Sequence, residues 1–218
     1  MKLKLAILPL CLIAMHAFGF EGTVKQSVTN FNGSGSNATM TWYIGAGACR
    51  IDMTIIDKEL KANNTVLLMN PSSQSITMYE TSGTGEKVYY QMNASAVSGD
   101  AMNIMVNKTT ETKKIGGYNC EKWTVMNNGG TYDVWITKDI DFNAAQYKDF
   151  FKGSMEIQAL AQQGVKGFPM LTESRTGANA SVTNTVTPGA VSAATLSVPA
   201  EYKLFNPQVS PNVAAPKK

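Results

Sequence analysis

The sequence predicts an α+β fold in which one large antiparallel sheet is interrupted once by a helical segment. Three observations lead to this prediction. Many short segments alternate apolar with polar residues, a period typical of half-buried antiparallel strands. Residues 143–163 instead place their apolar residues at helical spacing. Strand patterns then resume, and the order of many strands, one helical insert and further strands is typical of α+β proteins.

The clearest strands are residues 38–44 and 49–55, where every second residue is apolar. Trp42 lies on the apolar side of the first, and Cys49 and Met53 lie on the apolar side of the second. Turn residues at 70–73 and 127–130 predict hairpins. Further strands are predicted at residues 21–31, 65–69, 75–79, 88–92, 109–116, 119–126, 130–139, 168–174, 180–187, 193–198 and 199–205.

The helical insert, residues 143–163, is expected to cover the open face of the sheet. Its helical spacing directs Phe150, Phe151 and Leu160 inward, toward the strands. Gly153 is expected to divide the insert into two short helices, because glycine weakens a helix interior.

The N-terminus predicts export. Lys2 and Lys4 precede a short apolar run, and small residues follow it, as in a secretory signal peptide. We expect residues 1–19 to be removed after Gly19 and the protein to reach the periplasm or the cell surface. Residues 20–206 are then predicted to form one domain, followed by a proline-rich disordered tail at residues 207–218.

The charge of the predicted mature chain argues against nucleic-acid binding. Without residues 1–19 the chain has 17 basic and 16 acidic residues, a net charge of +1. Nucleic-acid binding depends on clustered positive charge, and Lys113 and Lys114 form only a pair. No second long apolar stretch follows the first, so the sequence predicts no transmembrane helix.

The sequence also offers little reactive chemistry. Cleavage would remove His16, the one histidine, and with it any Ser–His or Cys–His pair and any histidine-ligated metal site. No catalytic residue, metal site or cofactor is therefore predicted. The remaining enzymatic alternative is a hydrolase that uses carboxylates alone, for which Asp133, Asp139 and Asp141 are candidates. Helix capping and positions on a solvated face explain all three aspartates, so a binding or structural protein is favoured over an enzyme.

Two cysteines, Cys49 and Cys120, remain in the predicted mature chain. An even pair in an exported protein is consistent with a disulfide. Two buried, unreactive thiols that pack as small apolar side chains are an equally good interpretation. The sequence leaves both alternatives open.

The ten methionines of the predicted mature chain, together with its aromatic residues, favour a pliable apolar groove. Such a groove would bind an apolar ligand or a lipidated partner protein. The alternative is a structural or interaction module of the cell envelope whose concave face is filled by its own helices. The candidate ligand-binding residues are Trp42, Met53, Met78, Phe150, Phe151 and Leu160.

Several motifs occur in a characteristic order. They are CRIDM (49–53), ETKKIGGYNCEKWTV (111–125), YDVWITKDI (132–140), GFPMLTES (167–174) and LSVPAEYK (196–203). Over residues 20–205 the chain resembles an uncharacterised family of exported bacterial proteins known as a domain of unknown function. More distantly, it is similar to the periplasmic lipoprotein carriers LolA, LolB and RseB.

The resemblance implies an unclosed antiparallel β-barrel with helices on its concave side, where the carriers hold acyl chains. It therefore implies a lipid or a lipidated protein as partner, and it supplies no catalytic residue. It also implies that Gly116 and Gly117 turn one strand into the next, with Tyr118 and Trp123 packed on the sheet. Lys122 would face solvent and Cys120 would be structural.

Overall fold

The structure, a computed structural model, describes residues 19–205 except 32–33, 82–84, 97–102, 129 and 178–179. The predicted signal peptide lies outside the described residues apart from Gly19, and so does the whole of the predicted disordered tail. Both remain predictions.

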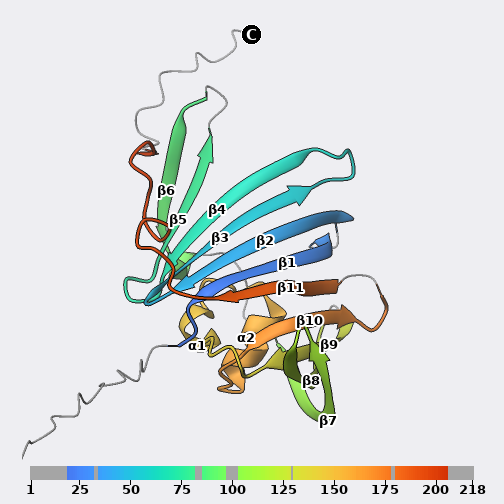
Figure 1. Cartoon of the computed structure of the whole chain (residues 1–218). Helices are drawn as coiled ribbons and strands as arrows, with labels where there is room; N and C mark the ends of the chain where they lie inside the picture. Colours follow the sequence, from blue (N-terminus) through green and yellow to red (C-terminus); the bar gives the residue numbers. More distant parts are fainter. Residues whose placement is uncertain are drawn as a thin grey trace, which may run out of the picture.

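Twelve strands among the described residues form one open, curved sheet (Figure 1) in the order β12-β6-β5-β4-β3-β2-β1-β11-β10-β9-β8-β7. Their bounds are β1 Gly22–Phe31, β2 Ser36–Gly45, β3 Ala48–Ile56, β4 Ala62–Asn70, β5 Ser75–Thr81, β6 Lys87–Asn93, β7 Met105–Ile115, β8 Tyr118–Asn127, β9 Gly130–Thr137, β10 Phe168–Ser174, β11 Ala180–Pro188 and β12 Lys203–Leu204. β12 pairs with β6 in the parallel direction, whereas β6 pairs with β5 in the antiparallel direction. The predicted α+β fold, an unclosed barrel with a helical insert, is confirmed.

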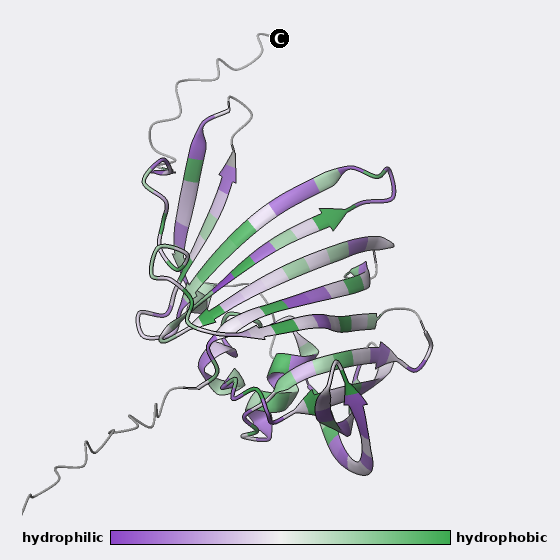
Figure 2. Ribbon diagram, in the orientation of Figure 1, coloured by the Kyte–Doolittle hydropathy of each residue, from purple (hydrophilic) through white to green (hydrophobic). Residues whose placement is uncertain are grey.

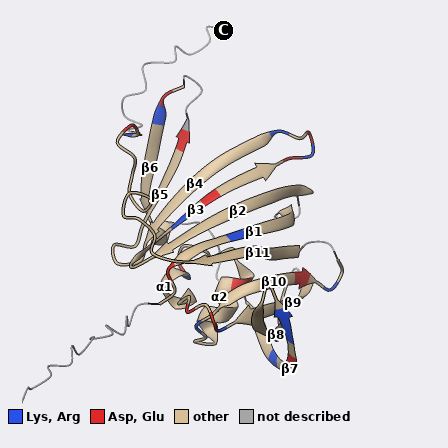
Figure 3. Ribbon diagram, viewed as in Figure 1, with Lys and Arg blue, Asp and Glu red and all other residues tan. Residues whose placement is uncertain are grey.

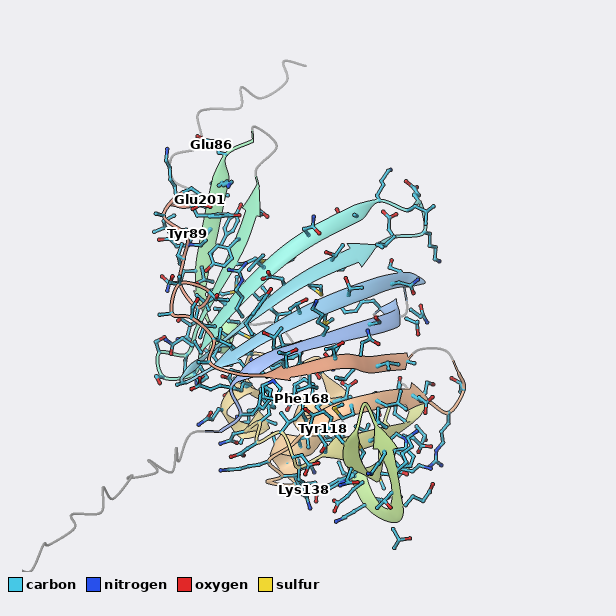
Figure 4. All side chains as sticks on the ribbon, viewed as in Figure 1. Glu86, Tyr89, Tyr118, Lys138, Phe168 and Glu201 are labelled. Atoms are coloured by element: carbon cyan, nitrogen blue, oxygen red, sulfur yellow. The ribbon has the colours of Figure 1, made fainter. Side chains whose placement is uncertain are left out.

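The pairing of β1 with β11 joins the two parts of the sheet, which are β1 to β6 with β12 on one side and β7 to β11 on the other. Figure 4 marks the two ends: Glu86, Tyr89 and Glu201 lie at the β6 end, and Tyr118 and Lys138 lie at the β7–β8 end. At the latter end the predicted hairpin between β7 and β8 is present, with Gly116 and Gly117 at φ of 58° and 89°. Glycine adopts these left-handed angles without steric cost, which allows the tight turn.

The helical insert lies between β9 and β10 and consists of α1, Ala144–Tyr147, and α2, Met155–Gln162. The side chain of Ser154 accepts a hydrogen bond from the Ile157 amide and caps α2. Gly153 lies between the two helices, as predicted. A short 3₁₀ helix, Ala94–Ala96, follows β6. In the described ranges no helix has the length and apolar character needed to cross a membrane.

The core lies between the concave face of the sheet and this insert. The register places Ile44 opposite Cys49 and Cys49 opposite Met69, so these buried side chains form one row across three strands. The period-2 alternation predicted for β2 and β3 is therefore confirmed. Figure 2 shows hydrophobic residues on α2 and along β3 and β4.

The strand predicted at residues 193–198 is wrong. This segment forms turns, in which the Thr195 amide donates to the carbonyl of Ser192. It packs on the convex face, where Arg50 Nη1 donates to the carbonyl of Thr195 at 3.3 Å. The predicted strand at 199–205 is reduced to the two residues of β12. Pro199 has no amide hydrogen for a strand ladder, which accounts for part of this difference.

Candidate functional site

A groove with a volume of about 710 Å³ separates the concave face of the sheet from the start of α2. Its apolar floor comes from β1 to β4 and includes Val28, Met40, Trp42, Ile51, Met53 and Leu67. Its wall on the helical side includes Phe150, Phe151, Met155 and Ile157. Polar side chains from the β8–β11 part of the sheet complete the lining, among them Asn127, Tyr132, Thr172, Ser174 and Ser181.

Strand register explains why the apolar floor is continuous. Trp42 is opposite Ile51, and Ile51 is opposite Leu67, so the three side chains lie in one row across β2, β3 and β4. Met40 and Met53 form a second pair on the same face, because residues two apart on a strand point the same way.

Trp42 is held by aromatic rings from the helical insert, from the segment before it and from β10. Its ring meets Phe142 and Phe168 edge-on, with centroids 6.3 Å and 5.7 Å away. Phe151 packs against it at 5.4 Å. Only 6% of the Trp42 side chain is exposed, so its position is fixed by these contacts.

Two buried polar groups at the groove have no hydrogen-bond partner within the described part of the chain. They are the indole nitrogen of Trp42 and the hydroxyl of Thr172. Nearby, Gln26 is fully engaged as a donor, since its amide donates to the hydroxyl of Thr183 at 3.0 Å and to the carbonyl of Pro169 at 3.4 Å. Most buried polar groups have partners, so the two unpaired groups are unusual features of the groove.

Charge is sparse at the groove. Of the described lining residues, only Glu156 carries a charged side chain, and its carboxylate accepts a hydrogen bond from the hydroxyl of Ser154 at 3.0 Å. Figure 3 shows that β2 and β11 carry no charged residue, whereas charges gather at the loop ends and on β7 to β9. The interior of the groove is therefore weakly negative and mainly apolar.

The structure brings together four of the six predicted ligand-binding residues: Trp42, Met53, Phe150 and Phe151 line the groove. Met78 lies one strand beyond it, opposite Leu67. Leu160 is fully buried in the core and does not line the groove. That any of these residues binds a ligand remains a prediction.

Sequence reasoning missed several lining residues. Met40 shares the period-2 pattern of Trp42, and that pattern identifies it. Leu67 lies in the continuous apolar run 66–69, where alternation does not show which side of the strand faces the groove. Thr172 and Glu156 gave no such signal. Their position depends on how β10 and α2 pack, which is a tertiary feature.

Both cysteines are free and buried, so the structure agrees with the second alternative and not with a disulfide. Cys49 lies on β3 and Cys120 on β8, and five strands separate these two in the sheet. Burial raises the pKa of both thiols. A raised pKa suppresses the reactive thiolate.

The three candidate carboxylates lie outside the groove. Asp133 bonds to Arg175 at 2.9 Å and to Lys122 at 3.2 Å. Asp139 borders a separate, shallow polar cleft with Lys113 and Lys138. The backbone carbonyl of Asp141 accepts a hydrogen bond from the backbone amide of Phe20. Among the residues that the structure describes, no group of three or more His, Cys, Asp and Glu side chains is placed to hold a metal ion.

Comparison with known proteins gives a family but no activity. A family model described as a domain of unknown function (DUF4412) matches residues 20–202. Two crystal structures of PNGF-II, in space groups P21 and C2, are similar with TM-scores of 0.44 and 0.45 and identities of 16% and 15%. The matches cover 85% and 87% of this chain but only 32% and 31% of the PNGF-II chains. No curated protein gives a significant match.

Proposed function

The chain belongs to the DUF4412 family, and we propose that it is an exported, non-enzymatic protein of the cell envelope that binds a lipid chain in its groove. The lipid is a free amphiphile or the acyl chain of a lipidated protein. The signal-like N-terminus supports export, and the predicted loss of the one histidine would leave the mature chain without a Ser–His or Cys–His pair.

The open apolar groove carries this proposal. Ligand pockets commonly have volumes of about 300–1,000 Å³ and are mainly apolar, with a few polar groups that orient the ligand. The groove, at about 710 Å³, falls in this range, and its floor is formed by aliphatic, methionine and aromatic side chains. Methionine adapts its shape to different chains, which suits a lipid site.

The groove also argues against a purely structural module. In that alternative the concave face is filled by the helices of the protein itself. Here α1 and α2 leave open space above Met40, Met53 and Leu67, all of which are only half-buried. A bound chain would remove this apolar surface from water, at about 25 cal/mol for each Å².

The test is binding of the neutral, environment-sensitive dye Nile red to the purified protein. We expect saturable fluorescence at micromolar concentration, and displacement by a lipid with a dodecanoyl chain. Met53→Glu places a charge on the groove floor and should abolish binding. Met105→Glu is the matched control, because Met105 is 62% exposed on β7 and does not line the groove.

Absence of saturable binding, or equal binding by both variants, would contradict the proposal. An acylated peptide with the same chain separates the two sources of lipid. If it displaces the dye at a tenfold lower concentration than the free lipid, the natural occupant is a lipidated protein.

A further inference from the structure

We propose that the groove selects a neutral head group that carries oxygen acceptors, such as an acyl ester of glycerol, and disfavours the carboxylate of a free fatty acid. This inference rests on the proposed function, because it specifies which amphiphile occupies the same groove. It is carried by two unpaired polar groups and by the charge of the lining.

The unpaired groups call for a ligand with acceptor atoms. The indole N–H of Trp42 can only donate, and the hydroxyl of Thr172 can donate or accept. Both residues line the groove, both are more than nine-tenths buried, and neither polar atom has a partner among the residues described. A buried donor without an acceptor is costly. Less than 1 Å² of either atom is exposed, so an ester or hydroxyl oxygen of the ligand would satisfy it after a rotation of the side chain toward the groove.

The charge of the lining disfavours an anion. A carboxylate in the groove would find no lysine or arginine among the described lining residues, and it would share the space with Glu156. The N-terminus of α2 does not offset this lack of basic side chains. Glu156 already occupies the first turn, where a helix favours negative charge, and Ser154 already accepts from the Ile157 amide.

The opposite side of the groove suits a hydroxylated head group. Tyr132, Ser174 and Ser181 bring hydroxyl groups to the lining from β9, β10 and β11, while β2 to β4 supply the apolar floor. An amphiphile would therefore lie with its chain over Met53 and Leu67, on β3 and β4, and its head over β9–β11, the part of the sheet that carries Thr172. The ring of Trp42, on β2, reaches this side, because it contacts Phe168 of β10 at 5.7 Å.

The experiment compares two competitors with the same chain, monododecanoylglycerol and dodecanoate, for displacement of Nile red at neutral pH. We expect the ester to bind at least about tenfold more tightly, which corresponds to about 1.4 kcal/mol. Glu156→Gln removes the negative charge that repels a carboxylate. It should raise the affinity for dodecanoate alone and so narrow the difference in affinity between the two competitors. Glu173→Gln is the matched control, since Glu173 is exposed on β10 and outside the groove.

Thr172→Val tests the head-group contact with little change of volume. It should lower the affinity for the ester by about three- to tenfold, which is the effect of losing one neutral hydrogen bond. Thr185→Val, at an exposed position on β11, should leave the affinity for the ester unchanged.

The outcomes distinguish the two proposals. Dodecanoate that binds as tightly as the ester, or a Thr172→Val variant that binds the ester unchanged, would overturn the head-group inference while lipid binding stands. If neither competitor displaces the dye, lipid binding itself fails.

Discussion

Phe151 packs against Trp42 with ring centroids 5.4 Å apart and planes inclined by 32°. Phe151 follows α1 in the segment that leads to α2, and Trp42 lies in the middle of β2. This contact therefore joins the helical insert to the sheet. Both residues also line the groove, so the same contact that holds the insert determines the shape of the site.

The Trp42–Phe151 contact predicts energetic coupling between insert and sheet. We expect a double-mutant cycle with Trp42→Leu and Phe151→Leu to give a coupling energy of about 0.5–1.5 kcal/mol, as for other aromatic pairs. Urea unfolding of the four proteins measures it. A coupling energy near zero would show that the insert is held in place by other contacts.

Phe150 is predicted to be a stronger determinant of stability than Phe151. Only 7% of its side chain is exposed, and its ring lies 6.0 Å from that of Tyr147. Phe150→Ala should lower the free energy of unfolding by about 3–5 kcal/mol, because it leaves a cavity. Met105→Ala, at an exposed position, should change it by no more than about 0.5 kcal/mol. A loss below about 1 kcal/mol for Phe150→Ala would contradict its burial.

The sequence predicts most of the sheet because alternation reports which side of a strand is buried. Trp42, Met53 and their neighbours alternate clearly, and the structure places them together on the concave face. The segment at 193–198 has a similar composition but forms turns, because its contacts are with the convex face and not with a neighbouring strand. Local pattern cannot distinguish these two environments.

The candidate site is predicted only in part for a related reason. Residues such as Phe150 and Phe151 are recognisable because a helical pattern places large aromatic side chains on one side. Leu160 belongs to the same pattern, yet it enters the core one turn further from the groove. Thr172 and Glu156 become part of the site only because β10 and the start of α2 come together in space.

Asp133 predicts a pH dependence of stability. Burial by itself would raise the pKa of this carboxyl, but its bonds to Arg175 and Lys122 outweigh burial and hold the pKa below its ordinary value. The unfolded chain therefore binds a proton more readily than the folded one. The resulting stabilisation is present above the ordinary pKa of aspartate, about 3.9, and is lost as the pH falls through the lower folded value.

We accordingly expect the wild-type protein to lose more stability than Asp133→Asn when the pH falls from about 5 to about 2. Urea titrations at each pH provide the measurement. Asp149→Asn, at a surface site beside Lys148, serves as the control and should follow the wild type. Identical pH profiles for all three proteins would mean that the Asp133 network contributes nothing to stability.

The last prediction concerns Cys49 and Cys120, which the structure holds as free thiols on strands that lie far apart in the sheet. Cys49→Ala and Cys120→Ala should each lower the free energy of unfolding. The loss in the double variant should equal the sum of the two single losses to within about 0.5 kcal/mol. A disulfide would instead contribute about 2–4 kcal/mol, which either single variant would remove completely. Addition of a reductant should leave the unfolding curve unchanged.

Thiol labelling of the chain that begins at residue 20 completes this test. In denaturant, without reductant, two labels should attach, one at each cysteine. In the native state iodoacetamide should react slowly at neutral pH, since burial raises the pKa of both thiols and keeps them protonated and covered. Rapid native labelling confined to Cys120 would contradict its structural role. It would direct attention to the cleft that this residue shares with Lys113 and Asp139.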